Sequence, residues 1–375
     1  KIIYWSGETT TEPGPNVHII PTTGWPITTA GTLIAEQASW PTYNRDGTTI
    51  AFSHHYGTGY TGDRDIYIAD AAGNFKFSLT NMGDEQGNMG YGGEWGPNGE
   101  FVFTSYLSGY RNIWLATPKS SDYVYVDGIG YFARIQEAIN AASSGDTINV
   151  AAGTYDEQVI IKKNLTLQGV GDTTIIKPSQ ATVDGFTLFS RYAGSGDISA
   201  SVVVATETDG GVVTDITIKD LKVDSSLVTA VPSGSSLIGI QYRHANGTID
   251  NVTASDIGSG LLGTIKEYSC AIFTSAFESA KATTVEIKNC AVSSYGKNGI
   301  TANEPYTTAN IHDNTVTGLG ATSDVCQNGI QFGWAATGTI SDNEVSNMAY
   351  TGTDYDATGI LLYEASGTVT GNTIT

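Results

Sequence analysis

Acidic and aromatic side chains gather in the last third of the sequence, at spacings that suit acid–base chemistry. Glu304 and Glu364 each follow an Asn/Thr-Gly-Ile phrase, while Asp354 and Asp356 precede the last such phrase. Cleavage of a glycosidic bond needs two such carboxyl groups, one that donates a proton and one that activates water or attacks. Side chains that would hold a sugar stand nearby or in equivalent places of the repeat: Trp334, Tyr350, Tyr355, Tyr363 and Arg243.

Closely spaced aspartates raise calcium as the one cofactor to consider. The stretch TGDRDIYIAD carries Asp63 and Asp65, and TDYDAT carries Asp354 and Asp356. Carboxylate oxygens are the hard ligands that Ca²⁺ prefers. Neither stretch completes a known loop motif, so these four residues are the metal-ligand candidates and no full ligand set is predicted.

Composition excludes several classes of partner. The formal net charge is −20, which disfavours nucleic acid and anionic membranes because both need basic patches. There is no run of 18 apolar residues, so the sequence predicts no membrane span. The chain starts in a strand-like run and stops inside a repeat, so we expect a longer parent protein.

Three columns of aliphatic residues recur about every 30 residues and indicate short strands stacked in a coil. A fourth column contains Cys290, Asn314, Asn343 and Asn372, and it predicts an amide ladder at a tight turn with Cys290 as a buried thiol. Cys270 and Cys326 stand two rungs apart, too far for a disulfide. The aliphatic columns are Ile218, Ile249, Ile287, Ile311, Ile340 and Val369; Val223, Ala254, Val292, Val316, Val345 and Ile374; and Ile240, Ile272, Ile300, Ile330 and Ile360.

An amphipathic helix is predicted over 135–142, where it would cover the open end of the coil. This stretch, IQEAINAASSGDTINVAAGTYDEQVIIKKNLTLQGVGDTTII, resembles the amino-terminal cap of pectate-lyase-like right-handed parallel β-helix proteins, a pattern widespread in archaeal and bacterial surface proteins. The resemblance covers residues 123–375 and implies a fold. It does not imply one activity, because such proteins include lyases, hydrolases, epimerases, adhesins and structural modules.

The first third repeats a different unit. PTYNRDGTTIAFSHHYGTGYTGDRDIYIADAAG and GEWGPNGEFVFTSYLSGYRNIWLATP share an aromatic residue, a turn and two strands. They resemble TolB-type β-propeller blades, too few to close a propeller. We therefore predict an all-β chain in which an incomplete blade segment, 1–120, precedes a β-helix, 121–375. The β-helix has its cap at 123–178 and its rungs at 212–375, continuing beyond the last residue.

The strand that each Gly-Ile phrase opens bears the chemistry in the enzymes of this resemblance. The residues predicted to point outward from it contain no carboxylate. The leading hypothesis is therefore an extracellular or cell-surface structural or adhesive protein, a component of a surface layer, sheath or filament that assembles with itself or with other surface proteins, and not an enzyme. The alternatives are a polysaccharide lyase or glycoside hydrolase working in a groove on the β-helix, and a non-catalytic glycan-binding module. The outward residues are Gln241, Phe273, Thr301, Gln331 and Leu361, then Arg243, Ser275, Asn303, Gly333 and Tyr363.

Overall fold

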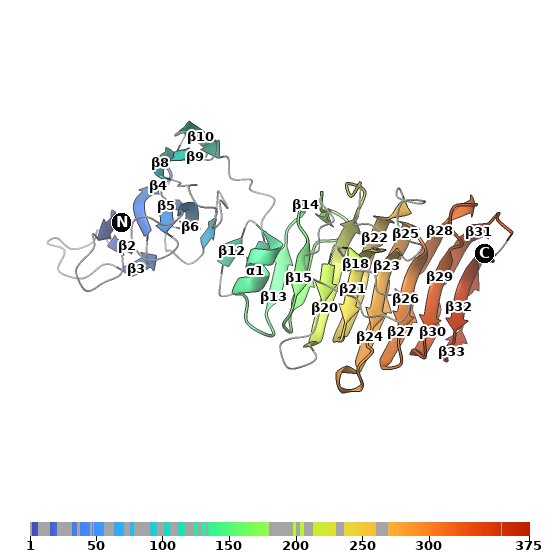
Figure 1. Ribbon diagram of the computed structural model, residues 1–375. Helices are drawn as coiled ribbons and strands as arrows, with labels where there is room; N and C mark the ends of the chain where they lie inside the picture. The colour runs from blue at the N-terminus through green and yellow to red at the C-terminus, as the bar shows by residue number, and fades with distance from the viewer. Residues whose placement is uncertain are drawn as a thin grey trace. The chain divides into compact units, whose positions relative to one another are not determined.

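The computed structural model of the chain forms two compact units, Lys1–Ala133 and Arg134–Thr375 (Figure 1). Both are mostly β-structure, as predicted, and the described residues include one short α-helix. The described residues are 2–6, 16–20, 32–35, 38–45, 47, 49–55, 64–70, 76–78, 91–95, 101–105, 112–116, 124–126, 130–132, 134–179, 198–199, 203–205, 213–229, 236–259, 269–353 and 355–375.

The described residues of the first unit form three antiparallel sheets and a short hairpin, β11 (Val124–Val126) with β12 (Gly130–Phe132). In β5, Ile50 and Phe52 point to one side and Ala51 to the other, so the middle sheet is apolar on both faces. Sheet 1 is β1 (Ile2–Ser6), β2 (Asn16–Ile20) and β3 (Thr32–Ala35); sheet 2 is β4 (Ala38–Tyr43), β5 (Thr49–His55), β6 (Arg64–Asp70) and β7 (Lys76–Ser78); sheet 3 is β8 (Tyr91–Trp95), β9 (Phe101–Ser105) and β10 (Asn112–Ala116).

The second unit begins with helix α1 (Ile135–Ala141), which covers the first rungs of a coil, as predicted. Ile135, Ala138 and Ile139 are its buried stripe. The start of the helix is capped from a distance, because both Glu157 carboxylate oxygens accept backbone N–H groups, from Ile135 at 2.7 Å and Gln136 at 3.0 Å. Burial raises the pKa of Glu157, and the two N–H groups partly oppose that rise.

The coil is built from strands that pair in parallel with the equivalent strands one turn later, as in a parallel β-helix (Figure 1). The described strands of the coil form two hydrogen-bonded sheets, a larger one whose two faces are here called sheets A and B, and a second one here called sheet C. Sheet A contains β13 (Thr147–Val150), β16 (Thr166–Gln168), β20 (Val213–Asp224), β22 (Ala245–Ile257), β24 (Thr283–Lys288), β27 (Thr307–His312), β30 (Thr337–Ser341) and β33 (Thr368–Thr370). Sheet B continues from the long strands β20 and β22, with β14 (Gly153–Tyr155), β17 (Thr174–Ile176), β25 (Ala291–Tyr295), β28 (Thr315–Thr322), β31 (Glu344–Tyr350) and β34 (Thr373–Ile374). Sheet C contains β15 (Val159–Ile161), β19 (Val203–Ala205), β21 (Ser236–Arg243), β23 (Cys270–Ser275), β26 (Asn298–Asn303), β29 (Asn328–Gly333) and β32 (Thr358–Tyr363), and β18 (Ile198–Ser199) pairs with β21.

The strand register confirms the three predicted aliphatic columns. Ile218 pairs with Ile249 and the column continues residue by residue to Val369. The columns that start at Val223 and Ile240 are paired in the same way. Most of these side chains are fully buried, so the core is a stack of aliphatic layers about 4.8 Å apart.

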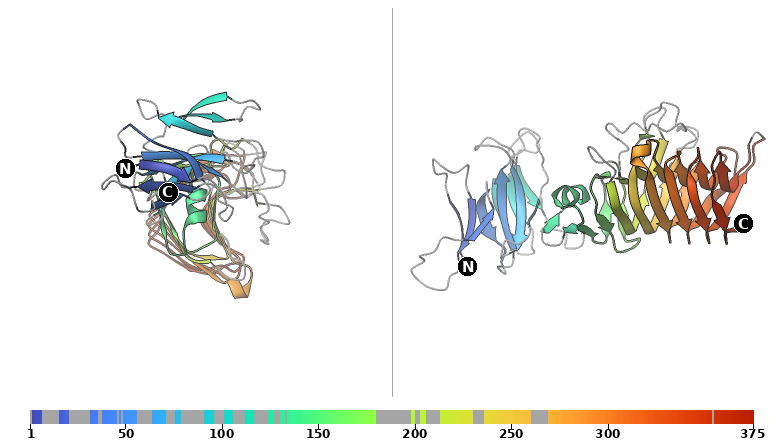
Figure 2. Two further views of the ribbon diagram at one scale, coloured as in Figure 1. Left: turned by 90° about the vertical axis from the view of Figure 1, so that its left-hand side faces the viewer. Right: turned by 90° about the horizontal axis from the view of Figure 1, so that it is seen from below.

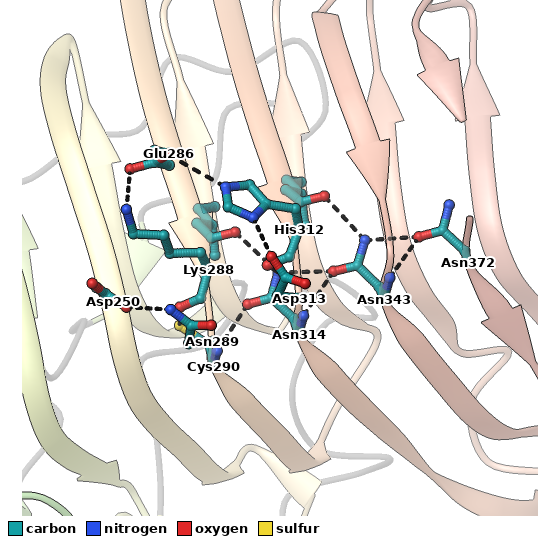
Figure 3. A network of polar contacts seen from close by, with 12 residues as sticks. Asp250, Glu286, Lys288, Asn289, Cys290, His312, Asp313, Asn314, Asn343 and Asn372 are labelled. Carbon is teal, nitrogen blue, oxygen red and sulfur yellow. Dashed lines mark hydrogen bonds and ion pairs between the residues drawn. The ribbon is translucent and has the colours of Figure 1, made fainter. Parts of the chain in front are cut away.

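The predicted amide ladder is also confirmed (Figure 3). The Asn314 side chain donates to Asn343 Oδ1 at 2.9 Å, and the Asn343 side chain donates to Asn372 Oδ1 at 2.8 Å. Each oxygen also accepts the backbone N–H of the preceding Asn in the ladder. Cys290 ends the ladder as a buried thiol, and its N–H donates to Asn314 Oδ1 at 2.9 Å.

Candidate functional site

Sheet C differs from the sequence-based picture of a strand with one solvent-facing side. In β23, β26 and β29 every residue is buried. The outward columns predicted from the sequence therefore do not form an open surface over these rungs. Thr301, Gln331, Ser275 and Asn303, all expected to point outward, are almost completely shielded from solvent.

Amide side chains on these strands are connected from rung to rung. Asn328 donates to Asn298 Oδ1 at 3.0 Å and to Gln331 Oε1 at 3.1 Å. Gln331 in turn donates to Asn303 Oδ1 at 3.4 Å. A buried polar network of this kind fixes the positions of its members, because each unmade bond is costly at low dielectric.

Three polar atoms next to this network have no hydrogen-bond partner within the described part of the chain. They are Ser275 Oγ, Asn303 Nδ2 and Trp334 Nε1, and each is buried. Ser275 and Asn303 are register neighbours on β23 and β26. Buried polar groups are nearly always satisfied, so these are the groups that a ligand or an ordered water would complete.

The residues that directly follow the last five strands of sheet C, β21, β23, β26, β29 and β32, form a row, here called the rim. Four of its five members have a left-handed backbone, with φ of 50° at His244, 83° at Glu304, 53° at Trp334 and 50° at Glu364. Side chains of these types pay about 1–2 kcal/mol to adopt that conformation. The remaining member is Ala276, and backbone N–H groups of the rim continue the pairing of the rungs.

The turn between sheets A and B uses the same backbone conformation with different residues. Its left-handed positions are occupied by types that tolerate positive φ, namely Asp, Asn and Gly. The rim instead holds Glu304, Trp334 and Glu364 beside His244. Glu and Trp, unlike His, are types that local backbone preference does not favour at positive φ. The left-handed turn positions are Asp220, Asn251, Asn289, Asp313, Asp342 and Gly371.

Two carboxyl groups of the rim flank an aromatic ring. Glu304, Trp334 and Glu364 follow three successive rungs, so the two glutamates are separated by about 10 Å along the coil. Glu304 is 1% exposed, whereas Glu364 is exposed to solvent. Trp334 packs edge-to-face on Tyr363, with ring centroids 5.1 Å apart, and Tyr363 is itself exposed. Four of the predicted site residues therefore lie at the ends of three successive strands of sheet C: Glu304, Trp334, Tyr363 and Glu364.

Arg243 lies three rungs before Trp334 and contacts a different ring. Its guanidinium carbon is 5.5 Å from the centre of the Phe277 ring, a cation–π contact. The neighbouring His244 is buried against the same ring, and its Nε2 accepts the Phe277 N–H at 3.3 Å. In that hydrogen bond Nε2 is the acceptor, and the bond fixes the orientation of the imidazole ring.

Other predicted site residues lie at the opposite edge of sheet C. Asp356 and Tyr355 precede β32, are exposed, and are separated from Glu364 by a six-residue strand about 20 Å long. Glycosidase carboxyl pairs are about 5–10 Å apart, so Asp356 and Glu364 do not form such a pair. The Asp356 carbonyl accepts from the Cys326 thiol at 2.7 Å, and Tyr350 ends β31, half-buried.

The calcium candidates are only partly described. Asp63 and Asp354 lie outside the described residues, and of Asp65 the structure gives only its backbone in β6. Among the residues that are described, no three His, Cys, Asp or Glu side chains are grouped so that they would hold a metal ion. Calcium binding stays a prediction.

Cys270 and Cys290 do not have the properties of reactive cysteines. Burial raises the pKa of each thiol to about 12, whereas a reactive cysteine needs a lowered pKa. All three cysteines are buried and none is in a disulfide.

A charged cluster on sheet A is the other polar feature near the amide ladder (Figure 3). Glu286 pairs with Lys288 at 2.7 Å and with His312 Nε2 at 3.3 Å, while His312 Nδ1 contacts Asp313 at 2.7 Å. The hydrogen bond to Asp313, then that to Glu286, raises the pKa of His312. Both imidazole nitrogens are therefore engaged, and the cluster ties adjacent rungs together.

Comparisons with known proteins find partial relatives of one kind. The chain is 35% identical to pectinesterase 2 of Citrus sinensis over 142 residues, 36% of this chain and 26% of that protein. It is 36% identical to the probable pectinesterase/pectinesterase inhibitor 17 of Arabidopsis thaliana over 127 residues, 32% of this chain and 23% of that protein. The chain thus spans about a quarter of the length of these relatives.

No protein-family model matches the chain, and no solved structure is significantly similar to it. None of the helices in the described part of the chain is long and apolar enough to cross a membrane. The chain has distant, partial homology to pectinesterases. This homology favours the carbohydrate-active alternative of the sequence analysis over the structural hypothesis.

Proposed function

We propose that the β-helix unit is an extracellular carbohydrate-active hydrolase that acts on a pectin-like polysaccharide at the rim of sheet C. The observation that carries the proposal is the row of left-handed His, Glu and Trp residues where Gly or Asn would be less strained. Backbone strain of this kind clusters at active sites and ligand-binding sites. The partial homology to pectinesterases supplies the substrate class.

Glu304 and Glu364 are the two carboxyl groups that this rim offers. Burial disfavours the charged form of a carboxyl group, so we assign Glu304 as the general acid and the exposed Glu364 as the general base. Glu364 takes a proton from water, the water oxygen attacks the scissile bond, and Glu304 gives its proton to the leaving oxygen. Trp334 and Tyr363 provide the ring surfaces between them.

The charge of these rungs selects the form of the substrate. From Asn298 to Thr375 the sequence has no Lys or Arg, while Glu304, Asp313, Asp324, Asp342, Glu344, Asp354, Asp356 and Glu364 lie in the same stretch. Such a surface repels a polyanion. We therefore propose that the neutral, methyl-esterified polysaccharide is the substrate and the de-esterified chain is not.

The test is a product assay on methyl-esterified pectin and on polygalacturonate. Methanol release, new reducing ends and unsaturated products distinguish ester hydrolysis, glycoside hydrolysis and elimination. We expect hydrolytic product from esterified pectin, reduced at least about 100-fold in Glu304→Gln and Glu364→Gln. Glu278→Gln is the matched control, because Glu278 also follows a strand of sheet C but is exposed and paired with Lys281. Hydrolytic activity that both glutamine variants retain would refute the assignment.

A non-catalytic glycan-binding module is the second candidate. It is favoured by the absence of carboxylates from the outward columns of sheet C and by the Trp334–Tyr363 pair, whose tyrosine is exposed. If the wild-type chain gives no product yet binds esterified pectin in affinity electrophoresis, and Trp334→Ala abolishes the shift, this second function replaces the first.

A further inference from the structure

A polar cavity lies at the end of sheet B, where the two long strands β20 and β22 stop. These strands belong to neighbouring rungs, paired in parallel register and drawn yellow-green to yellow in Figure 2. The residues at and directly after their ends line a cavity of about 270 Å³. The rim follows the strands of sheet C, whereas this cavity lies at strand ends of sheet B, so it is a separate site.

Hydroxyl groups make up most of the cavity lining. One carboxylate and one aliphatic side chain accompany them, and the described lining residues include no Lys, Arg or His. Hydroxyl groups both donate and accept hydrogen bonds, whereas an ionised carboxylate only accepts them. The cavity therefore offers more acceptors than donors. The hydroxyls belong to Ser225, Ser226, Thr229 and Ser259, the carboxylate to Asp256 and the aliphatic side chain to Val228.

The hydroxyl of Ser225 is buried at this cavity without a partner. Ser225 is 2% exposed, and its Oγ makes no hydrogen bond within the described part of the chain. Its backbone is satisfied, since the carbonyl accepts the Val228 N–H at 2.9 Å and the N–H donates to the Ser255 carbonyl at 3.4 Å. Buried polar groups are nearly always hydrogen-bonded, so this hydroxyl points to a ligand group in the cavity.

Hydrogen bonds hold both walls of the cavity in place. On the first wall, Asp224 Oδ1 accepts the Ser226 N–H at 2.9 Å, and two lysine side chains pair with the same carboxylate at 3.3 and 3.4 Å. On the second wall, the Asp256 carbonyl accepts the Gly258 N–H at 3.2 Å. A site that is formed in advance loses less conformational freedom when a ligand binds.

We propose that this cavity binds one neutral sugar unit. A sugar ring carries several hydroxyl groups, which donate to the Asp256 carboxylate and complete the hydrogen bonding of Ser225. An acidic sugar is repelled by Asp256, because no basic side chain among the described lining residues offsets that charge. Sites for drug-sized molecules measure roughly 300–1,000 Å³, so a slightly smaller cavity suits a single ring. The proposal does not rest on the function proposed for the rim.

The test is saturation-transfer NMR of the full chain with galactose, arabinose and glucose, and with galacturonate as the acidic counterpart of galactose. We expect a Kd of about 1 mM for at least one neutral sugar and at least about fivefold weaker binding of galacturonate. Ser225→Ala should weaken the neutral sugar about 3- to 10-fold, the effect of one neutral hydrogen bond. Asp256→Asn should weaken it about fivefold, because hydrogen bonds to a charged acceptor are roughly twice as strong.

The control variant is Asp342→Asn, which should leave sugar binding unchanged. Asp256 and Asp342 have the same left-handed backbone, with φ of 59° and 56°, and Asn tolerates it at both positions. Asp342 is exposed in a turn between sheets A and B, away from the cavity.

Three results would overturn the proposal. They are no binding of any neutral sugar up to about 10 mM, galacturonate binding as tight as that of galactose, and binding that neither Ser225→Ala nor Asp256→Asn weakens. Melting of the sugar-free proteins adds a fourth check. Ser225→Ala should not lower the Tm, because Oγ makes no hydrogen bond in the described chain, and a lower Tm would show that the hydroxyl serves the fold. Since free sugars and not polysaccharide products are measured, failure here leaves the rim proposal untouched.

Discussion

The amide ladder gives the most direct measure of what holds the rungs in register. Asn343 is 1% exposed and takes part in four hydrogen bonds through its side chain. Replacing it with alanine leaves two buried groups without their partner, the Asn314 N–H and the Ile311 carbonyl. Each such loss costs about 1–3 kcal/mol, so we expect Asn343→Ala to lower the free energy of unfolding by about 4 kcal/mol.

Thr339→Ala is the control on a strand of the same turn. Thr339 donates one exposed hydrogen bond, to Asn310 Oδ1 at 3.0 Å, and its loss should cost less than about 0.5 kcal/mol. Asn343→Cys should fall between the two. Cys290 shows that a thiol fits this column, with Sγ at 3.1 Å from the Lys288 carbonyl. A thiol at position 343 would, however, offer no strong acceptor to the N–H of Asn314 in the preceding rung.

The assay is guanidinium unfolding followed by circular dichroism, together with hydrogen exchange of the peptides around residues 307–345. The exchange measurement is needed because stacked repeats can open locally without the whole chain unfolding. If Asn343→Ala loses less than about 1 kcal/mol and exchange in these rungs is unchanged, the ladder does not stabilise the coil and the reasoning fails.

Three further predictions follow from single contacts. Glu157→Ala should destabilise the cap by about 1–2 kcal/mol, because the N–H groups of Ile135 and Gln136 lose their acceptor. The effect should be seen as faster amide exchange in residues 135–141, and unchanged exchange there would contradict the prediction. The pKa of His312 is raised, so its protonated imidazole stabilises the fold below the ordinary histidine pKa of 6.5, and this contribution is lost as the pH rises through the raised value. The unfolding midpoint should therefore fall less between pH 6 and pH 9 in His312→Gln than in the wild type. An equal fall in both proteins would refute the pairing. Glu364→Asn should relieve the strain of the left-handed backbone at an exposed site and raise the free energy of unfolding by up to about 1 kcal/mol, while activity on esterified pectin is lost. A variant less stable than the wild type would show that Glu364 serves the stability of the fold.

The sequence predicted the β-helix register because its signals repeat at a fixed period. One aliphatic residue at Ile311 is weak evidence, but the same type at Ile287 and Ile340, one turn away on either side, fixes the register of three strands. Asn314 and Asn343 were recognisable for the same reason. The cap was harder to predict, since Glu157 acts on a helix start 22 residues earlier and local capping signals do not extend that far.

The conformation of the rim had no signal in the sequence. Asn and Gly indicate positive φ because they adopt it at low cost, and this is how the turn at Asn289 and Gly371 is recognised. Glu304 and Trp334 have the same conformation, but their residue types predict the opposite. The sequence also did not predict that both sides of β26 and β29 are buried. Polar residues such as Asn303 and Gln331 suggest a solvent-exposed face, but in the structure they are buried and hydrogen-bonded to each other.

The hypothesis of a structural, non-enzymatic protein rested on the absence of carboxylates from the outward-facing strand positions of sheet C. The two outward columns of sheet C contain none, and in a flat sheet that would remove acid–base chemistry from the face. A coil must turn after every strand, however, and the first residue of the turn leaves the strand direction. At that residue the left-handed backbone of Glu304 and Glu364 redirects the side chain at the edge of the sheet. Because the turn recurs on every rung about 4.8 Å apart, it can place an acid, a ring and a base in one row without any carboxylate on the strands.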